Sequence, residues 1–285
     1  MKVPPTSTAG HSVRRCRPLL GTFVEITVTA TDVTRLVPAL EAAFASVERV
    51  QHLMSAHDEE SELSRVNADA FTRPVQVSDE PFEVLQRGLE LSRASDGAFD
   101  FTIAPLLARW GMLPALLRRR AGGTWRDVVL QHGRRVSFAR PLAIDLGGIA
   151  KGFAVDAAMA ALRAHRVSAA TVNAGGDLRV FGADATPVHL RHPVSARPME
   201  PHISLLNAAL ATSSPCFTRR RWRGKTVSHL INPLNRQAVI TRRSVSVRAG
   251  ECWLADALTK IVWNAPAAAP RLLEAYEAEA WILTA

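Results

Sequence analysis

The chain has 285 residues, and 47% of them are hydrophobic, so it can bury one substantial core or the cores of two small lobes, which excludes an intrinsically disordered protein. Its 35 Lys and Arg residues outnumber its 26 Asp and Glu residues, which gives a formal net charge of +9 at pH 7. A basic surface favours an anionic ligand, but it also suits a nucleic acid or an anionic membrane face.

The order of apolar and polar residues predicts helices and strands in chain order. Residues 1–16 are rich in Pro, Ser and Thr and are expected to form a flexible tail, while residues 17–285 are expected to form one domain of one or two lobes. Alternating apolar residues at 24, 26 and 28 predict a strand, and apolar steps of three and four from 36 to 54 predict a helix capped by Asp32. Further helices are predicted over 81–95, 151–164 and 251–263, and further strands over 169–172, 178–181, 187–190, 244–248 and 281–283.

These elements intermix without a regular strand–helix–strand rhythm. The sequence therefore predicts an α+β fold with mixed sheets and packed helices, and not a doubly wound Rossmann fold.

The segment 143–182 has the composition of a phosphate-binding turn. The run Ile144-Asp145-Leu146 is typical of a strand end, Gly147-Gly148 lets the backbone approach a ligand, and Lys151 stands at the start of a helix whose first N–H groups point at that ligand. The alternative for Lys151 is an ordinary surface lysine, and for Asp145 a strand-end or capping residue. Gly175-Gly176-Asp177 is typical of a tight turn between two strands.

Motifs in one fixed order along the chain carry a resemblance to a known family. The segment 144–156, I-D-L-G-G-I-A-K-G-F-A-V-D, is similar to the signature L-D-L-G-G-I-A-K-G-Y-A-V-D of the ApbE flavin transferases. The other matching blocks are R-P-L-L-G-T at 17–22, M-S-A-H at 54–57, S-E-L-S-R-V-N at 61–67, G-A-F-D-F-T at 97–102, A-T-S at 211–213, S-H-L-I-N-P at 228–233 and A-D-A-L-T-K at 255–260.

This resemblance implies a fold and an activity. The fold would be the T-fold-like ApbE architecture, and the reaction would move FMN from FAD to a threonine hydroxyl of an acceptor protein with release of AMP. Mg²⁺ would assist the reaction, and the acceptor threonine would lie in a segment of the D-[GA]-[AS]-T type.

The resemblance also assigns roles to individual residues. His229 would be the general base, or would alternatively position the flavin, with Asp256 and Lys151 as further catalytic residues. The family pattern implies contacts to FAD for Leu20, His57, Ala98, Phe99, Asp100 and Leu230, and Mg²⁺ ligands for Gly148 and Asp256. From the glycine-rich segment Asp145 and Lys151 are further candidates for FAD binding, and from helix geometry Thr259 is a further candidate for Mg²⁺ binding.

Two positions depart from the family pattern. Lys260 stands where the family has a threonine, four residues after Asp256, and a charged lysine cannot ligate magnesium. Thr259 lies three residues after Asp256, on the same helix face, and can still offer its hydroxyl. Lys260 could instead place its ammonium beside the phosphates or form an i,i+4 ion pair with Asp256. Whether it removes, relocates or reshapes the metal site stays open. His57 replaces a tyrosine, and its ring can still stack on a flavin.

Other functions and locations remain alternatives at this point. A non-enzymatic FAD carrier or an FAD pyrophosphatase that yields FMN and AMP would use the same cavity. A single Tyr and the lack of aromatic residues within basic motifs argue against nucleic acid. The three cysteines predict neither disulfides nor a zinc site. Without a signal peptide, lipobox or membrane anchor in the given sequence, a cytoplasmic location is expected, or a periplasmic one if a leader was removed.

Overall fold

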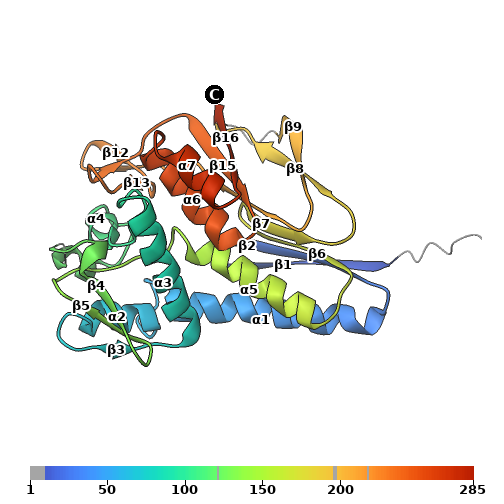
Figure 1. Ribbon diagram of the computed structural model, residues 1–285, viewed down its shortest axis with the longest axis horizontal. Helices are drawn as coiled ribbons and strands as arrows, with labels where there is room; N and C mark the ends of the chain where they lie inside the picture. Colours follow the sequence, from blue (N-terminus) through green and yellow to red (C-terminus); the bar gives the residue numbers. More distant parts are fainter. Residues whose placement is uncertain (1–9, 121, 195–197, 217) are drawn as a thin grey trace, which may run out of the picture.

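A seven-stranded antiparallel sheet forms the centre of the computed structural model, which describes residues 10–120, 122–194, 198–216 and 218–285 (Figure 1). The sheet order is β1-β2-β6-β7-β10-β15-β16. The strands are β1 (His11–Leu19), β2 (Thr22–Ala30), β6 (Ala169–Ala174), β7 (Asp177–Phe181), β10 (Ala209–Ser213), β15 (Arg243–Ala249) and β16 (Glu279–Thr284).

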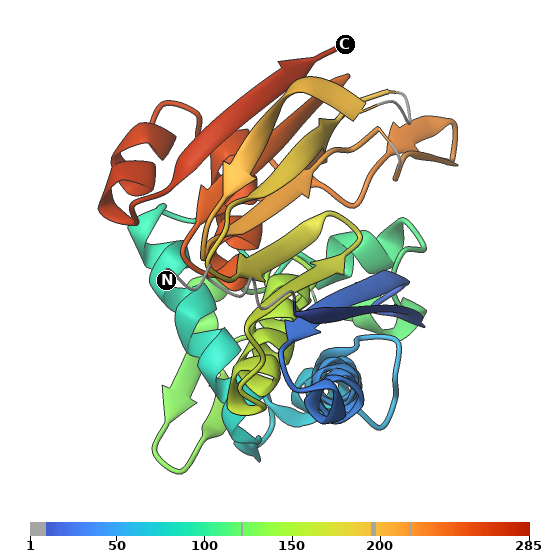
Figure 2. The same cartoon turned by 90° about the vertical axis from the view of Figure 1, so that its right-hand side faces the viewer.

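Three helices pack together and against this sheet. They are α1 (Leu36–Met54), α5 (Ala150–Ala164) and α6 (Cys252–Asn264). Figure 2 shows α1 nearly end-on below the first two strands, with α5 beside it. The strand β2 explains the arrangement locally, because Val24, Ile26 and Val28 alternate with polar residues and all three are fully buried.

A second group of elements lies near the C-terminal end of α1 and the N-terminal end of α5 (Figure 1). It contains α2 (Glu62–Asp69), α3 (Asp79–Ala94), α4 (Ala104–Arg109) and a small sheet of β3 (Val75–Gln76), β5 (Arg135–Phe138) and β4 (Val128–Gln131). Three single-turn helices cover 33–35, 115–119 and 125–127. Apolar side chains from both groups of elements join in one continuous core, so the chain does not divide into separate cores at this boundary.

Short antiparallel hairpins complete the fold. They are β8 (Thr186–Arg191) with β9 (Pro198–Leu205), β11 (Arg220–Trp222) with β12 (Lys225–Val227), and β13 (Ile231–Asn232) with β14 (Gln237–Ala238). The last helix, α7 (Ala269–Ala275), precedes β16.

The α+β prediction is confirmed, since neighbouring strands of the main sheet pair in antiparallel fashion and a doubly wound sheet would be parallel. Residues 11–16, which were expected to belong to a flexible tail, instead lie in strand β1. This strand begins at His11 and pairs with β2 along its whole length. Its backbone bonds to β2 order it although its side chains are mostly exposed. Residues 1–9 of the expected tail lie outside the described residues.

Within the described part of the chain, none of the helices has the length and apolar character needed to cross a membrane.

Candidate active site

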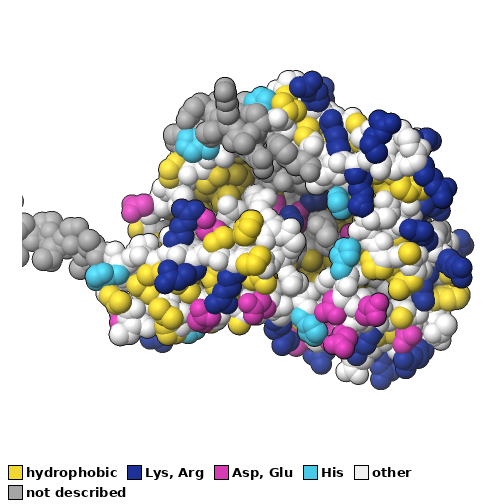
Figure 3. All heavy atoms as spheres, turned by 180° about the vertical axis from the view of Figure 1, so that it is seen from behind, with side chains coloured by type: hydrophobic (Ala, Val, Ile, Leu, Met, Phe, Trp, Pro, Cys, Tyr) yellow, Lys and Arg dark blue, Asp and Glu magenta, His cyan; other side chains and the backbone are white. Residues whose placement is uncertain are grey.

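A cavity of about 660 Å³ opens between the main sheet, the N-terminus of α5 and the C-terminal half of α6. Figure 3 shows the hollowed face, with histidine and basic side chains near the hollow. The cavity is lined by the turn 98–103, the segment 145–151, the β6–β7 turn, part of β8, the end of β10 and the segment 229–233. Its size suits a large organic ligand.

The N-terminus of α5 is held tightly against α6. A Cβ on Gly152 would lie 2.3 Å from the carbonyl oxygen of Cys252, so only glycine permits this approach. As a result the backbone N–H of Gly152 donates to a carboxylate oxygen of Asp256 at 3.3 Å. The glycine-rich turn and Asp256, more than a hundred residues apart in sequence, therefore meet at one site.

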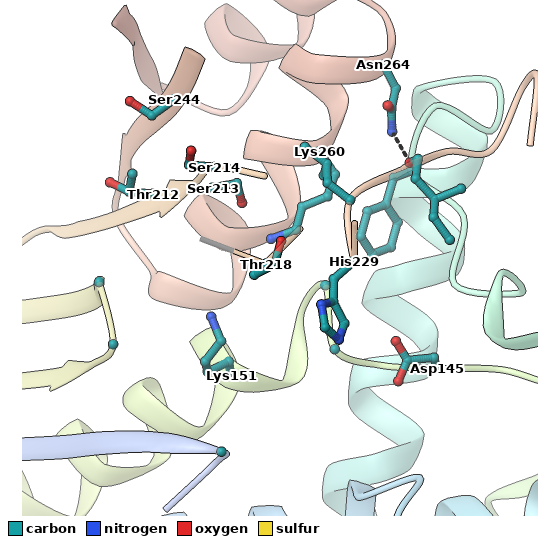
Figure 4. Close-up of a pocket in the computed structure, with 18 of the residues that line it drawn as sticks. Asp145, Lys151, Thr212, Ser213, Ser214, Thr218, His229, Ser244, Lys260 and Asn264 are labelled. Carbon is teal, nitrogen blue, oxygen red and sulfur yellow. Dashed lines mark hydrogen bonds between the residues drawn. The ribbon is translucent and has the colours of Figure 1, made fainter. Parts of the chain in front are cut away.

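Two ion pairs stand at this meeting point. Lys151 binds Asp177, and Lys260 binds Asp256. The side chains of Asp177 and Asp256 are only 2% and 1% exposed, whereas both lysines line the cavity. Asp177 and Asp256 do not themselves line the cavity. In Figure 4 the labelled Lys151 and Lys260 direct their nitrogens toward the same region.

The charges of this cluster act on one another. Burial disfavours the charged form of Lys151, but Asp177 and Asp256 outweigh it and raise the pKa of the ammonium above its ordinary value. Burial and the nearby Asp256 raise the pKa of Asp177. Burial also opposes ionisation of Asp256, yet Lys260 and Lys151 bring its pKa below the ordinary value. Asp256 is therefore ionised and Lys151 is a cation.

The donor set expected for magnesium does not fit a metal here. The Asp256 carboxylate is bound by the Lys260 ammonium and by the Gly152 N–H. The Thr259 hydroxyl donates to the Asp256 carbonyl at 2.7 Å and lies 2.7 Å from the Ser213 hydroxyl, so it points into the helix packing and is fully buried. Among the described residues, no three His, Cys, Asp or Glu side chains cluster as metal ligands.

Most of the residues expected to contact FAD line the cavity. These are Ala98, Phe99, Asp100, Asp145, Lys151 and Leu230, and the expected metal ligand Gly148 lies with them. Leu20 and His57 do not line it, although the neighbouring Gly21 does. Leu20 instead packs against the core with a backbone φ of 56°, and its N–H donates to Gln51.

Two carboxylates stand on the cavity wall near its apolar part. Burial raises the pKa of Asp145. The hydrogen bond from the backbone N–H of Gly147 and the charge of His57 act in the opposite direction but are weaker. Burial likewise raises the pKa of Asp100, although its Oδ1 accepts bonds from the backbone N–H and hydroxyl of Thr102. Both can accept hydrogen bonds from polar groups of a ligand ring or chain.

His229 stands at the mouth of the cavity and its ring is exposed in part. Partial desolvation by the cavity walls lowers its pKa, and the positive charges of Arg220 and His57 lower it further. The imidazole is therefore neutral at pH 7 and able to accept a proton. In Figure 4 its ring lies between Asp145 and Lys260 in projection.

Sequence reasoning missed two residues of the site. Asp177 looked like part of a turn, but its buried carboxylate holds Lys151. Asn264 donates from Nδ2 to the carbonyl oxygens of Ala98 at 2.9 Å and Ile231 at 3.3 Å, and its Oδ1 finds no hydrogen-bond partner in the described part of the chain. An asparagine in the last turn of an apolar helix is the only sequence signal for it.

Comparisons with known proteins show to which family the chain is similar. The profile of the ApbE family matches residues 20–282. The chain is 30% identical over 229 residues to an FAD:protein FMN transferase of Vibrio cholerae, covering 74% of this chain and 69% of the relative. It is 26% identical over 263 residues to one from Klebsiella pneumoniae, covering 85% and 75%.

Solved structures agree on the fold. The flavin transferase ApbE from Vibrio cholerae superposes with a TM-score of 0.82 at 26% identity, covering 96% of this chain and 94% of that one. The ApbE protein of Thermotoga maritima gives a TM-score of 0.85 at 24% identity with the same coverage. The family match over nearly the whole chain, together with this fold, shows that the chain belongs to the ApbE family.

Proposed function

We propose that this protein transfers FMN from FAD to a threonine hydroxyl of an acceptor protein and releases AMP. The observation that carries the proposal is the convergence of Lys151, Lys260 and the first turn of α5 on one cavity. Two ammonium groups and a helix N-terminus attract a diphosphate, and an apolar wall beside them suits a flavin ring. Relatives that carry the name FAD:protein FMN transferase support the same reading.

The donor FAD would span the cavity. Its isoalloxazine ring would lie against the apolar wall that includes Phe99 and Leu230, with Ala98, Asp100 and Asp145 as further neighbours. Its two phosphates would lie beside Lys151 and Lys260.

The transfer is a substitution at phosphorus. The acceptor threonine oxygen forms a bond to the FMN phosphorus, and the bond from that phosphorus to the bridging oxygen breaks, so the electron pair and the charge leave with AMP. His229 takes the proton of the threonine hydroxyl, because its neutral imidazole stands at the open side where an acceptor segment enters. Lys151 and Lys260 donate hydrogen bonds to the phosphate oxygens as charge shifts to AMP.

The residues expected to bind magnesium are Gly148, Asp256 and Thr259. In this chain Asp256 is bound to Lys260, and the Thr259 hydroxyl is bound to Ser213 and a backbone carbonyl. No step of the proposal therefore passes through magnesium, and Asp256 acts by holding Lys260 and the first turn of α5 in place.

The acceptor is proposed to be a flavoprotein with an exposed segment of the D-[GA]-[AS]-T type. A short segment of this kind can reach the cavity mouth at His229 in extended form. The compartment in which the two proteins meet, cytoplasmic or periplasmic, would be that of the acceptor.

The test is a transfer assay with purified protein, FAD and an acceptor domain that contains a D-G-A-T segment. Covalent flavin is read by fluorescence of the denatured acceptor on a gel, and AMP by chromatography. We expect the two products in equal amounts, and none on a control acceptor with the threonine replaced by valine.

The same assay separates the alternatives. AMP and free FMN formed without any acceptor would identify an FAD pyrophosphatase. Tight FAD binding without AMP under every condition would identify a carrier. Either result would contradict the proposed transfer.

A further inference from the structure

The side chain of Lys260 occupies the position beside Asp256 that a cation would take. Its ammonium binds Asp256 Oδ1 and also donates to the Asp256 carbonyl oxygen at 3.0 Å. The side chain of Lys260 is 18% exposed and that of Asp256 1% exposed, so the pair is largely shielded from water. Lys260 is therefore a fixed positive charge and not a solvated surface lysine.

The charge balance of the site is complete without a metal ion. Each buried carboxylate already has one ammonium partner, Lys151 for Asp177 and Lys260 for Asp256. A divalent cation at Asp256 would have to displace Lys260, and that ammonium would lose its carboxylate partner. With an uncharged residue at 260, Asp256 would lack this ammonium and would be free to bind a cation.

The lysine also has the reach to act on a ligand. Its Cε lies 3.6 Å from the position a Cβ would take on Gly148, and Phe99 lies 3.5 Å from that same position. The stem of Lys260 thus passes between the glycine-rich turn and the cavity, and its ammonium faces the region that Lys151 faces (Figure 4). The two ammonium groups are placed to share one diphosphate.

We propose that the ammonium of Lys260 replaces the divalent cation at Asp256, so that this protein binds FAD and transfers FMN without magnesium. The inference rests on the proposed function for its catalytic part. During transfer the Lys260 side chain donates hydrogen bonds to the phosphate oxygens while the threonine oxygen–phosphorus bond forms and the bond to the leaving AMP oxygen breaks. Unlike a metal ion, this charge is part of the chain and cannot be removed by chelation.

The decisive variant is Lys260→Thr, which restores the spacing of aspartate and threonine found in the family. Mn²⁺ binding in the presence of saturating FAD is measured by electron paramagnetic resonance, with Mn²⁺ as the probe for a divalent site. We expect no stoichiometric Mn²⁺ binding by the wild-type protein and about one bound Mn²⁺ in the variant. Lys225→Thr, on the exposed β12 strand, is the matched control and should behave like the wild type.

The transfer assay gives the second readout. The wild-type protein should be equally active in EDTA and in Mg²⁺, while Lys260→Thr should lose about 10²–10³-fold in EDTA and recover much of that loss in Mg²⁺. Lys260→Met, which keeps the length without the charge or a hydroxyl, should be as slow as Lys260→Thr in EDTA and should recover little in Mg²⁺. Thermal melting confirms that each variant is folded before it is assayed.

Several results would overturn the inference. They are stoichiometric Mn²⁺ binding by the wild-type protein, a wild-type transfer rate that falls in EDTA and returns with Mg²⁺, or a folded Lys260→Thr variant that gains no Mn²⁺ site. Failure of the proposed function has a different signature, because no flavinylated acceptor would form in any buffer. The Mn²⁺ measurement would still decide the cation question in that case, since it needs only bound FAD.

Discussion

The backbone of Gly152, in the first turn of α5, lies directly against the backbone of Cys252, in the first turn of α6. A Cβ on residue 152 would lie 2.3 Å from the Cys252 carbonyl oxygen, so only glycine fits. This contact positions the Gly152 N–H on Asp256 and so aligns the start of α5 with the Lys260–Asp256 pair. The geometry of this region therefore depends on one glycine that does not itself line the cavity.

The change Gly152→Ala tests this dependence. Overpacking a close-packed interior costs about 1–3 kcal/mol, which exceeds the gain of about 1 kcal/mol that Ala brings to a helix interior. Because the obstacle is backbone and cannot change rotamer, we expect a lower free energy of unfolding in urea and weaker FAD binding by flavin fluorescence. Gly250→Ala is the control, since a Cβ there meets nothing within 4 Å. Equal stability of the two variants would contradict the packing argument.

The regular elements of the fold were predictable where burial leaves a period in the sequence. Helix α5 is Ala150–Ala164 against the predicted 151–164, and α6 is Cys252–Asn264 against 251–263. Strand β1 was not predicted over His11–Cys16, because its side chains are mostly exposed and carry no alternation. Its order comes from backbone pairing with β2, which leaves no mark in the sequence.

Site residues that belong to a recognisable motif could be predicted from the sequence. Residues whose role depends on a contact between distant parts of the chain were harder to predict. Lys151 and His229 were found from their motifs and do line the cavity. Asp177 was taken as part of a turn because Gly-Gly-Asp is typical of turns, and only its pairing with Lys151 across 26 positions reveals its role. The helix spacing of four residues already offered an ion pair between Lys260 and Asp256, and the structure confirms that pair.

The protonation of His229 predicts the acid side of the pH profile. A general base works in its neutral form, and desolvation, Arg220 and His57 lower the His229 pKa below its ordinary value of 6.5. The transfer rate at saturating FAD should therefore stay constant as the pH falls to 6.5 and decline only below it. His229→Gln should slow transfer by about 10²–10⁴-fold and abolish this limb.

Arg220→Gln checks the cause of that lowered pKa. Removing its positive charge should move the acid limb of the pH–rate profile to higher pH, toward 6.5, since a charge that disfavoured the imidazolium is gone. Arg221→Gln, at the next position of the same exposed strand, is the matched control and should leave the limb in place. If the acid limb does not move in Arg220→Gln, the group that titrates in the pH–rate profile is not His229.

Because Asp177 is the buried member of its pair with Lys151, we expect the free energy of unfolding to fall when the Asp177 carboxylate is removed. Asp177 is 2% exposed and Lys151 is 32% exposed in the side chain, so Asp177→Asn leaves a partly solvated ammonium without its carboxylate. We expect a loss of about 2–3 kcal/mol in the free energy of unfolding, below the value for a fully buried pair. The control is Asp184→Asn, an exposed aspartate in the following turn. Equal unfolding midpoints for the two variants in urea would show that the pair contributes nothing to stability.

Asn264 predicts a defect in recognition of the flavin ring. The residue lines the cavity, its Nδ2 donates to the carbonyl oxygens of Ala98 and Ile231, and its buried Oδ1 is without a partner among the described residues. Asn264→Ala should weaken the binding of riboflavin and of FAD by a similar factor, about tenfold for one lost hydrogen bond near 1.5 kcal/mol. Unchanged riboflavin affinity in a folded variant would remove Asn264 from the ring site.

For Lys151 we expect a loss of affinity for FAD but not for riboflavin, because Lys151 lines the cavity at the start of α5, where the phosphates of FAD would lie. A charge-assisted hydrogen bond contributes about 1.5–3 kcal/mol, so Lys151→Met should weaken FAD binding by about 10–100-fold. Riboflavin has no phosphate, and its affinity should change less than twofold, as titration of flavin fluorescence can measure for both ligands. Lys225→Met on the exposed β12 strand controls for loss of net charge alone. If riboflavin and FAD lost affinity equally in Lys151→Met, the lysine would be holding the cavity in shape through Asp177 and not binding the diphosphate.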